Sequence, residues 1–309
     1  CDKGAAIGCM NLGVMYEHGT GVAKDEKAAA AFYRRACDAK ATKACEYLAS
    51  LYRNGNGIDK DQARSGTLDA KASDQKDPES CFRLGVDYED GNGVQKDLLR
   101  AAGLYAKACD GGLPKGCNKL GYLYESGTGV AADPARAVSL YTRSCDAQNP
   151  AGCALLSSMY KQGLGVPKDP GQALALAQRA CDGNFAWGCY DLGRFYEDGL
   201  GTPKDVSQAV QLYIKACDGD AATACGFAGD LYRLGGDGLA KDPARAASYF
   251  ERACDGKYSD SCAKLGDMYR EGDGLAKDPA KADAQYQKGC DLGNAGAYRI
   301  DGGYYAKTG

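Results

Sequence analysis

Cysteine is the residue type in this 309-residue chain with the most obvious chemistry, because sixteen of them follow a regular pattern. They occupy two positions, eight residues apart, of a unit about 36 residues long. Cysteines spaced in this way can form disulfides, bind a metal or take part in redox reactions. The seven C-x7-C pairs are Cys1–Cys9, Cys37–Cys45, Cys109–Cys117, Cys145–Cys153, Cys181–Cys189, Cys217–Cys225 and Cys254–Cys262.

The spacing favours disulfides over a metal site. Zinc sites use closely spaced cysteine pairs with histidines nearby, whereas this chain has no C-x2-C and a single histidine, His18. The chain also lacks the C-x-x-C-H motif by which haem is attached covalently. We therefore expect no metal and no cofactor, and disulfides that place the protein in an oxidising compartment, either the periplasm or outside the cell. Cys81 and Cys290 lack a partner at this spacing and are expected to be free thiols, with an intermolecular bridge as the alternative.

Two S-x-x-K motifs raise the possibility of a serine nucleophile. They are Ser158-Met159-Tyr160-Lys161 and Ser261-Cys262-Ala263-Lys264, and the chain ends in Lys307-Thr308-Gly309. Penicillin-recognising enzymes combine S-x-x-K with S-D-N and with a K-T-G that lies on a strand. This sequence has no S-D-N and predicts no strand for the final triplet. We expect both serines to be ordinary helix residues, His18 to be a surface residue, and the protein not to be an enzyme.

The unit that carries the cysteines is predicted to be a pair of helices. Cys117, Leu120, Gly121 and Tyr124 recur at the spacing of one helical face, which predicts a first helix, here helix A. A glycine-rich turn at residues 127–130 ends it, because glycine accepts positive φ. A second helix, helix B, begins after an aspartate that can cap its free N–H groups and that is followed by proline in four units. These aspartates are Asp25, Asp61, Asp97, Asp133, Asp169, Asp205, Asp242 and Asp278.

A repeat of this length predicts an all-α solenoid, in which each unit buries its apolar face against its neighbours. We expect a single array over residues 1–309, with about eight full units and an incomplete unit from residue 290. Each C-x7-C pair would join the end of one helix B to the start of the next helix A. The second unit is degenerate near residues 61–80, where Asp69 replaces the helix-B tyrosine and Ser73 replaces the cysteine. We expect the least stable interior junction there.

One motif carries a family resemblance. The pattern L-G-x-x-Y-x-x-G-x-G-V at residues 120–130, followed by an alanine-rich helix, resembles the Sel1-like repeat (SLR) family. With C-x7-C at the junctions, the chain is similar to the Helicobacter cysteine-rich protein (Hcp) branch. The resemblance implies a right-handed α/α superhelix that is secreted or periplasmic and that binds a protein or peptide in a concave groove, in host interaction, envelope assembly or immunity. It also implies an alternative, because some Hcp members are described as penicillin-binding proteins or weak β-lactamases.

Composition narrows the class of partner. The chain has 38 basic and 41 acidic residues and a net charge of −3, without the basic stripe that nucleic-acid binding needs. No segment approaches the roughly 20 apolar residues of a membrane span. We therefore expect a monomer that binds a protein or peptide.

The expected binding surface is the side of helix A that faces away from the core. Its positions vary from unit to unit while the core positions repeat, and it mixes aromatic, arginine and acidic residues, which often anchor protein interfaces. The candidates are Phe82, Arg83, Asn118, Lys119, Tyr122, Tyr190, Asp191, Arg194, Phe227, Asp230, Lys264 and Asp267. Trp187 either packs over the adjacent cysteine bridge or contacts a partner.

Overall fold

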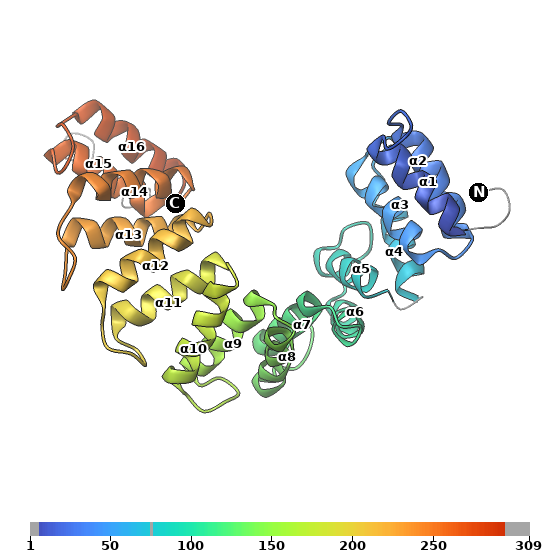
Figure 1. Ribbon diagram of the computed structural model, residues 1–309, viewed down its shortest axis with the longest axis horizontal. Helices are drawn as coiled ribbons and strands as arrows, with labels where there is room; N and C mark the ends of the chain where they lie inside the picture. Colours follow the sequence, from blue (N-terminus) through green and yellow to red (C-terminus); the bar gives the residue numbers. More distant parts are fainter. Residues whose placement is uncertain (1–5, 75–76, 294–309) are drawn as a thin grey trace. The chain divides into compact units, whose positions relative to one another are not determined.

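The computed structural model describes residues 6–74 and 77–293, which form sixteen α-helices joined by short loops (Figure 1). Within this part of the chain the extended structure is one isolated bridge, between Gly236 and Leu239. The helices are α1 (Ala6–His18), α2 (Glu26–Asp38), α3 (Thr42–Asn54), α4 (Gln62–Asp74), α5 (Pro78–Asp90), α6 (Leu98–Asp110), α7 (Pro114–Ser126), α8 (Pro134–Asp146), α9 (Pro150–Gln162), α10 (Pro170–Asp182), α11 (Ala186–Asp198), α12 (Val206–Asp218), α13 (Ala222–Leu234), α14 (Pro243–Asp255), α15 (Ser259–Glu271) and α16 (Pro279–Asp291). The predicted all-α repeat solenoid is confirmed.

Odd-numbered helices are the helices A of the repeat, and even-numbered helices are the helices B. The chain divides into two compact units, residues 1–147 with α1–α8 and residues 148–309 with α9–α16. Inside each unit, every helix packs against the helices that precede and follow it in the chain. We expect a single array over residues 1–309, but this depends on how the two compact units join, and it stays a prediction. The incomplete repeat expected from residue 290 falls largely on residues 294–309, outside the described residues.

The aspartates predicted to begin helix B do cap it. Asp133 has extended backbone angles, and its carboxylate accepts a hydrogen bond from the N–H of Arg136 at 3.0 Å. The other seven make the same bond to the residue three positions later. Since a capping residue contributes about 1 kcal/mol, this single feature fixes the start of every helix B.

Close contact between the two helices of a repeat depends on the helix-A glycine. A Cβ atom added to Gly121 would lie 2.5 Å from the ring of Tyr141 in α8. The Tyr141 side chain is completely buried. The phenol of Tyr141 then donates a hydrogen bond to Glu125, 2.7 Å away in α7. The same arrangement recurs with Gly13 and Tyr33, Gly85 and Tyr105, and Gly193 and Tyr213. The repeat therefore has a fixed lock between helix A and helix B.

Disulfides join consecutive repeats, as predicted. The bridges Cys37–Cys45, Cys109–Cys117, Cys181–Cys189, Cys217–Cys225 and Cys254–Cys262 run from the last turn of a helix B to the first turn of the next helix A, with Cα atoms 4.3 to 4.8 Å apart. Cys9, Cys145 and Cys153 are also disulfide-bonded, and Cys1 lies outside the described residues.

The two remaining cysteines occupy different surroundings. Cys81 is a free, buried thiol whose sulfur lies 2.7 Å from the hydroxyl of Ser73. Cys290 is half-buried in α16, and Tyr298, which stands at its partner position, is outside the described residues.

Candidate functional site

The second compact unit, residues 148–309, brings predicted binding residues into one aromatic cluster. Tyr190 of α11 and Phe227 of α13 meet edge to face with ring centroids 5.3 Å apart. Trp187 contacts Tyr190 edge-on at 5.7 Å and is 48% exposed, so it forms the outer part of this cluster. The guanidinium of Arg194 lies over Phe227 at 5.3 Å from the ring centroid. Four side chains from two adjacent helices A thus form one surface of aromatic rings with a cation stacked on it.

Other predicted residues of this unit have intramolecular partners. Lys264 of α15 reaches back to α13 and donates to Asp230 at 2.7 Å. Asp267 accepts hydrogen bonds from Tyr286 at 2.7 Å and from Arg270 at 3.1 Å. The Lys264–Asp230 ion pair connects two repeats, and the Tyr286–Asp267 hydrogen bond connects α16 to α15, so part of the predicted surface serves the fold itself.

The first unit carries the remaining candidates on α5 and α7. Tyr122 is 53% exposed, the largest exposure of any aromatic residue among those the structure describes. Lys119 pairs with Glu89 of α5 at 3.0 Å. Phe82 has the ammonium of Lys115 over its ring at 4.6 Å. Asn118, beside Lys119, is half-buried.

Arg83 belongs to a buried charge network instead of an open surface. It lies 3.2 Å from Asp69 and 3.3 Å from Glu46, and Arg53 also pairs with Asp69. Asp69 is fully buried, and burial raises its pKa although both arginines oppose that effect. The network lies around the degenerate second repeat, in the first compact unit, where no tyrosine is present to lock the helices.

A small pocket opens between α9 and α11 in the second unit. Its volume is about 180 Å³, and Lys161, Tyr190, Asp191, Arg194, Phe195, Asp198 and Leu200 line it. Asp191 has no hydrogen bond or ion pair within the described residues, and burial raises the pKa of its carboxyl. Arg194 pairs with Asp198 at 3.2 Å, whereas its Nε atom is buried, makes no hydrogen bond in the described chain and lies 3.8 Å from the Glu197 carboxylate. Three of the predicted surface residues therefore meet at a pocket.

Sequence reasoning did not identify this pocket, because Lys161 had been considered only as part of an S-x-x-K motif. The available signal was a pair of departures in the fifth repeat. Ala177 stands where other repeats have the locking tyrosine. Lys161 stands where four repeats have the glutamate that accepts a hydrogen bond from that tyrosine.

The S-x-x-K serines have the surroundings of structural residues. Ser158 lies on α9 and accepts a hydrogen bond from Gln162 at 2.7 Å, while Lys161 is directed toward the ring of Phe195. Ser261 is fully buried, and Lys264 is bound to Asp230. Neither lysine contacts its serine as a base would. The K-T-G triplet at 307–309 lies outside the described residues.

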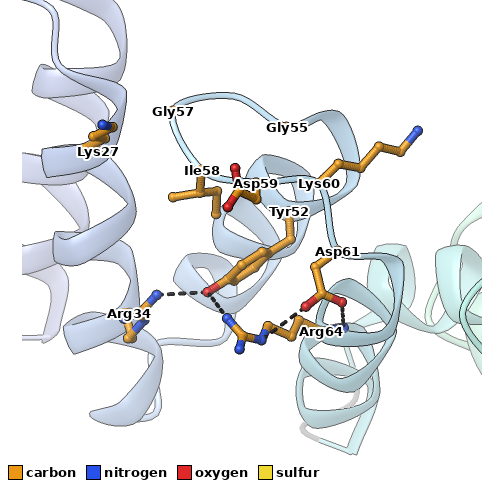
Figure 2. Close-up of a pocket in the computed structure, with 10 residues that line it drawn as sticks. All are labelled: Lys27, Arg34, Tyr52, Gly55, Gly57, Ile58, Asp59, Lys60, Asp61 and Arg64. Atoms are coloured by element: carbon orange, nitrogen blue, oxygen red, sulfur yellow. Dashed lines mark hydrogen bonds and ion pairs between the residues drawn. The ribbon is translucent and has the colours of Figure 1, made fainter.

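Figure 2 shows a second hollow, next to Tyr52 in the first unit, that the sequence did not predict. The Tyr52 hydroxyl accepts hydrogen bonds from Arg34 of α2 at 2.8 Å and from Arg64 of α4 at 3.5 Å. Arg64 also pairs with Asp61. An arginine over the helix-A tyrosine recurs in other repeats, as in Arg136 and Tyr124. This arrangement therefore belongs to the repeat, and Arg34 is its one addition.

The described residues contain no group of three or more His, Cys, Asp or Glu side chains that could hold a metal ion, and none of their helices has the length and apolar character of a membrane span. The disulfides point to an oxidising, extracytoplasmic compartment, since thiols in the cytosol are kept reduced.

Comparison with known proteins agrees with the helical repeat. The family model described as Sel1 repeat matches residues 6–40, 42–77, 78–113, 114–149, 150–185, 188–220, 221–258 and 259–294. No curated protein matches the chain.

Two solved structures share the fold over most of this chain. A Sel1 repeat protein from Oxalobacter formigenes is 28% identical with a TM-score of 0.75, covering 96% of this chain and 85% of that chain. A protective antigen with an SLR fold, present in uropathogenic Escherichia coli strains, is 25% identical with a TM-score of 0.73, covering 96% of this chain and 71% of that chain. Cysteine-rich protein B of Helicobacter pylori is 30% identical with a TM-score of 0.35, covering 42% of this chain and 92% of that chain.

Proposed function

This chain belongs to the Sel1 repeat family, and we propose that it is a secreted or periplasmic adaptor that binds a protein or peptide on the helix-A surface of its array. The observation that carries this proposal is the aromatic surface on α11 and α13. Trp187 is 48% exposed and Tyr190 is half-buried beside it, so a partner can cover both rings. Aromatic and arginine side chains dominate the binding energy of many protein interfaces.

The disulfides support such a role by keeping the surface in one conformation. A partner that binds a preorganised surface loses less conformational entropy than one that must order flexible loops. Bridges at successive junctions hold each helix A next to the helix B before it. A solenoid of this kind can present aligned side chains from several repeats to an extended peptide. Host interaction, envelope assembly and immunity are the settings in which we expect the partner.

The test compares helix-A aromatic residues with an exposed apolar residue elsewhere. Partners are captured by the full-length oxidised protein from periplasmic and extracellular fractions, identified by mass spectrometry and measured again with purified components. We expect Trp187→Ala and Tyr122→Ala to weaken binding by about tenfold or more, as loss of an aromatic anchor does. Leu99→Ala provides the matched control, because Leu99 is 70% exposed but lies on the helix B α6.

The two sets of variants separate the possible outcomes. Binding that survives both aromatic substitutions but is lost in Leu99→Ala would move the interface to the helix-B side. Binding that no variant affects would reject an aromatic-anchored surface altogether. Circular dichroism of each variant checks that the helical content is unchanged.

A further inference from the structure

The pocket between α9 and α11 lies where the repeat pattern is broken. The last turn of each helix A carries a charged residue at one equivalent position, and in seven of the eight repeats its side chain has a hydrogen bond or ion pair within the described chain. The exception is Lys161, whose ammonium instead lies 5.8 Å from the centroid of the Phe195 ring. With Ala177 in α10 in place of a tyrosine, no phenol is present to bind the residue at this position.

Comparison with an equivalent site sharpens this observation. Lys119 and Glu89 occupy the positions that Asp191 and Lys161 occupy two repeats later, with the charges exchanged. Lys119 and Glu89 form a direct ion pair at 3.0 Å. Asp191 and Lys161 form none, although they are near enough for Lys161 to influence the Asp191 carboxyl. The 180 Å³ pocket is open at this position, with room for about six water molecules' share of liquid volume, or for one side chain.

The charges of the lining select the kind of side chain that fits. Two basic residues, Lys161 and Arg194, face two acidic residues, Asp191 and Asp198, so the lining is neutral as a whole. A carboxylate would be drawn to Lys161 but repelled by Asp191, and an ammonium would meet the reverse. A neutral group with both an acceptor and donors satisfies both sides, because the Lys161 ammonium can only donate and the Asp191 carboxylate can only accept.

We propose that this pocket receives the carboxamide of a glutamine or asparagine side chain from the bound peptide. The carboxamide oxygen accepts from Lys161, and its NH2 group donates to Asp191. The rings of Tyr190 and Phe195 line the same pocket and cover the aliphatic part of the side chain. Burial raises the pKa of the Asp191 carboxyl, which is expected of a carboxylate that lacks its hydrogen-bond donors until a ligand binds. This proposal rests on the adaptor function, since it specifies one residue of the partner.

The probe is a random-peptide display library, panned on the full-length oxidised protein. We expect the enriched peptides to share a glutamine or asparagine at one position. In fluorescence anisotropy with a selected peptide, replacement of that residue by Glu, Lys or Ala should raise Kd about tenfold or more, since each lost hydrogen bond to a charged group costs that much or more. In Lys161→Met, the preference for the carboxamide peptide over its Ala counterpart should fall about tenfold, because the hydrogen bond to the ammonium is lost while the bond to Asp191 remains. Lys168→Met, which removes an exposed charge outside the pocket, should keep the preference.

The outcomes distinguish this proposal from the adaptor function. Peptides with an acidic or basic residue at the shared position, or a carboxamide preference that is undiminished in Lys161→Met, would overturn the pocket assignment. If such peptides still lose binding in Trp187→Ala, the adaptor function stands without the pocket. A library that yields no peptide dependent on the helix-A aromatic residues would overturn both. A crystal structure with a direct Lys161–Asp191 ion pair and an unchanged pocket in the peptide complex would also reject the carboxamide role.

Discussion

Arg53 of α3 pairs with Asp69 of α4 at the place where other repeats pair a glutamate with a tyrosine. Both members of the pair differ from the common ones, and they differ together: a buried carboxylate replaces the phenol, and a guanidinium replaces the carboxylate. Ala49 replaces the glycine that makes room for the ring. The degenerate repeat has therefore replaced the whole lock between its helices with an ion pair, instead of merely losing the tyrosine.

The common lock predicts the effect of adding one carbon atom at Gly121. We expect Gly121→Ala to destabilise the first unit by about 1 to 3 kcal/mol, because its methyl group would meet the Tyr141 ring at 2.5 Å in a packed core. This loss outweighs the roughly 1 kcal/mol that alanine gains over glycine in a helix. Gly103→Ala is the control, since no atom lies within 4 Å of a Cβ there. Chemical denaturation should place the two variants on opposite sides of the wild type; equal shifts would contradict the packing argument.

The ion-pair lock of the second repeat predicts a rescue. Asp69→Tyr alone should cost about 3 to 5 kcal/mol, because it leaves Arg53 and Arg83 without the buried carboxylate that they share and forces a ring against Ala49. Adding Ala49→Gly and Arg53→Glu supplies the two other members of the common lock. We expect the triple variant to recover more than half of the loss in thermal denaturation. If the triple variant is no more stable than the sum of its single changes, the three positions do not act as one unit.

The regular features of the fold were predictable because eight capping aspartates and seven C-x7-C pairs stand in one sequence. The capping aspartates and the C-x7-C junctions recur at a fixed spacing, so their roles follow from helix geometry alone. The compensations were not predictable in this way. Asp69 was recognised as a departure, but its link to Arg53 requires knowing which residue of helix A faces which residue of helix B.

The candidate site also has features that the repeat predicts and features that it does not. The period assigned Tyr190 and Phe227 to one side of helix A, and the structure brings their rings together. The repeat period alone does not show that Lys264 donates a hydrogen bond to Asp230 of the preceding repeat. A charged residue at a variable position looks the same in a sequence whether it binds a neighbour or a partner.

Asp87 gives the first unit a specific pH dependence. Burial raises its pKa to about 6, with Asp69 adding to the shift and Arg53 opposing it. An acid whose folded-state pKa is raised binds its proton more tightly in the folded protein, so its contribution to stability is fully present below the unfolded-state value and is lost as the pH rises through about 6. We expect Asp87→Asn, which cannot ionise, to be more stable than the wild type at pH 7.5 by about 2 kcal/mol.

This difference should shrink as the pH falls to 4.5, where the wild-type carboxyl binds its proton. Denaturation midpoints at both pH values measure it. Asp146→Asn, which removes an exposed carboxylate of the same unit, controls for the change in net charge. A constant gap between Asp87→Asn and the wild type at the two pH values would show that Asp87 does not titrate in this range.

Ser73 and Cys81 stand at the one junction, among those the structure describes on both sides, where a cysteine faces a serine. Their side-chain atoms are 2.7 Å apart, and both residues are buried at the positions that bridged cysteines occupy elsewhere. We expect Ser73→Cys to form a further disulfide with Cys81 and to stabilise the first unit by about 2.6 kcal/mol, the chain-entropy value for a loop of nine residues. Thiol titration in denaturant should find one reactive thiol fewer than in the wild type, although the variant contains one cysteine more. Ser73→Ala isolates the loss of the hydroxyl. An additional reactive thiol in Ser73→Cys would show that the two cysteines do not bridge. An unchanged unfolding midpoint once the bridge has formed would mean that this junction does not limit the stability of the unit.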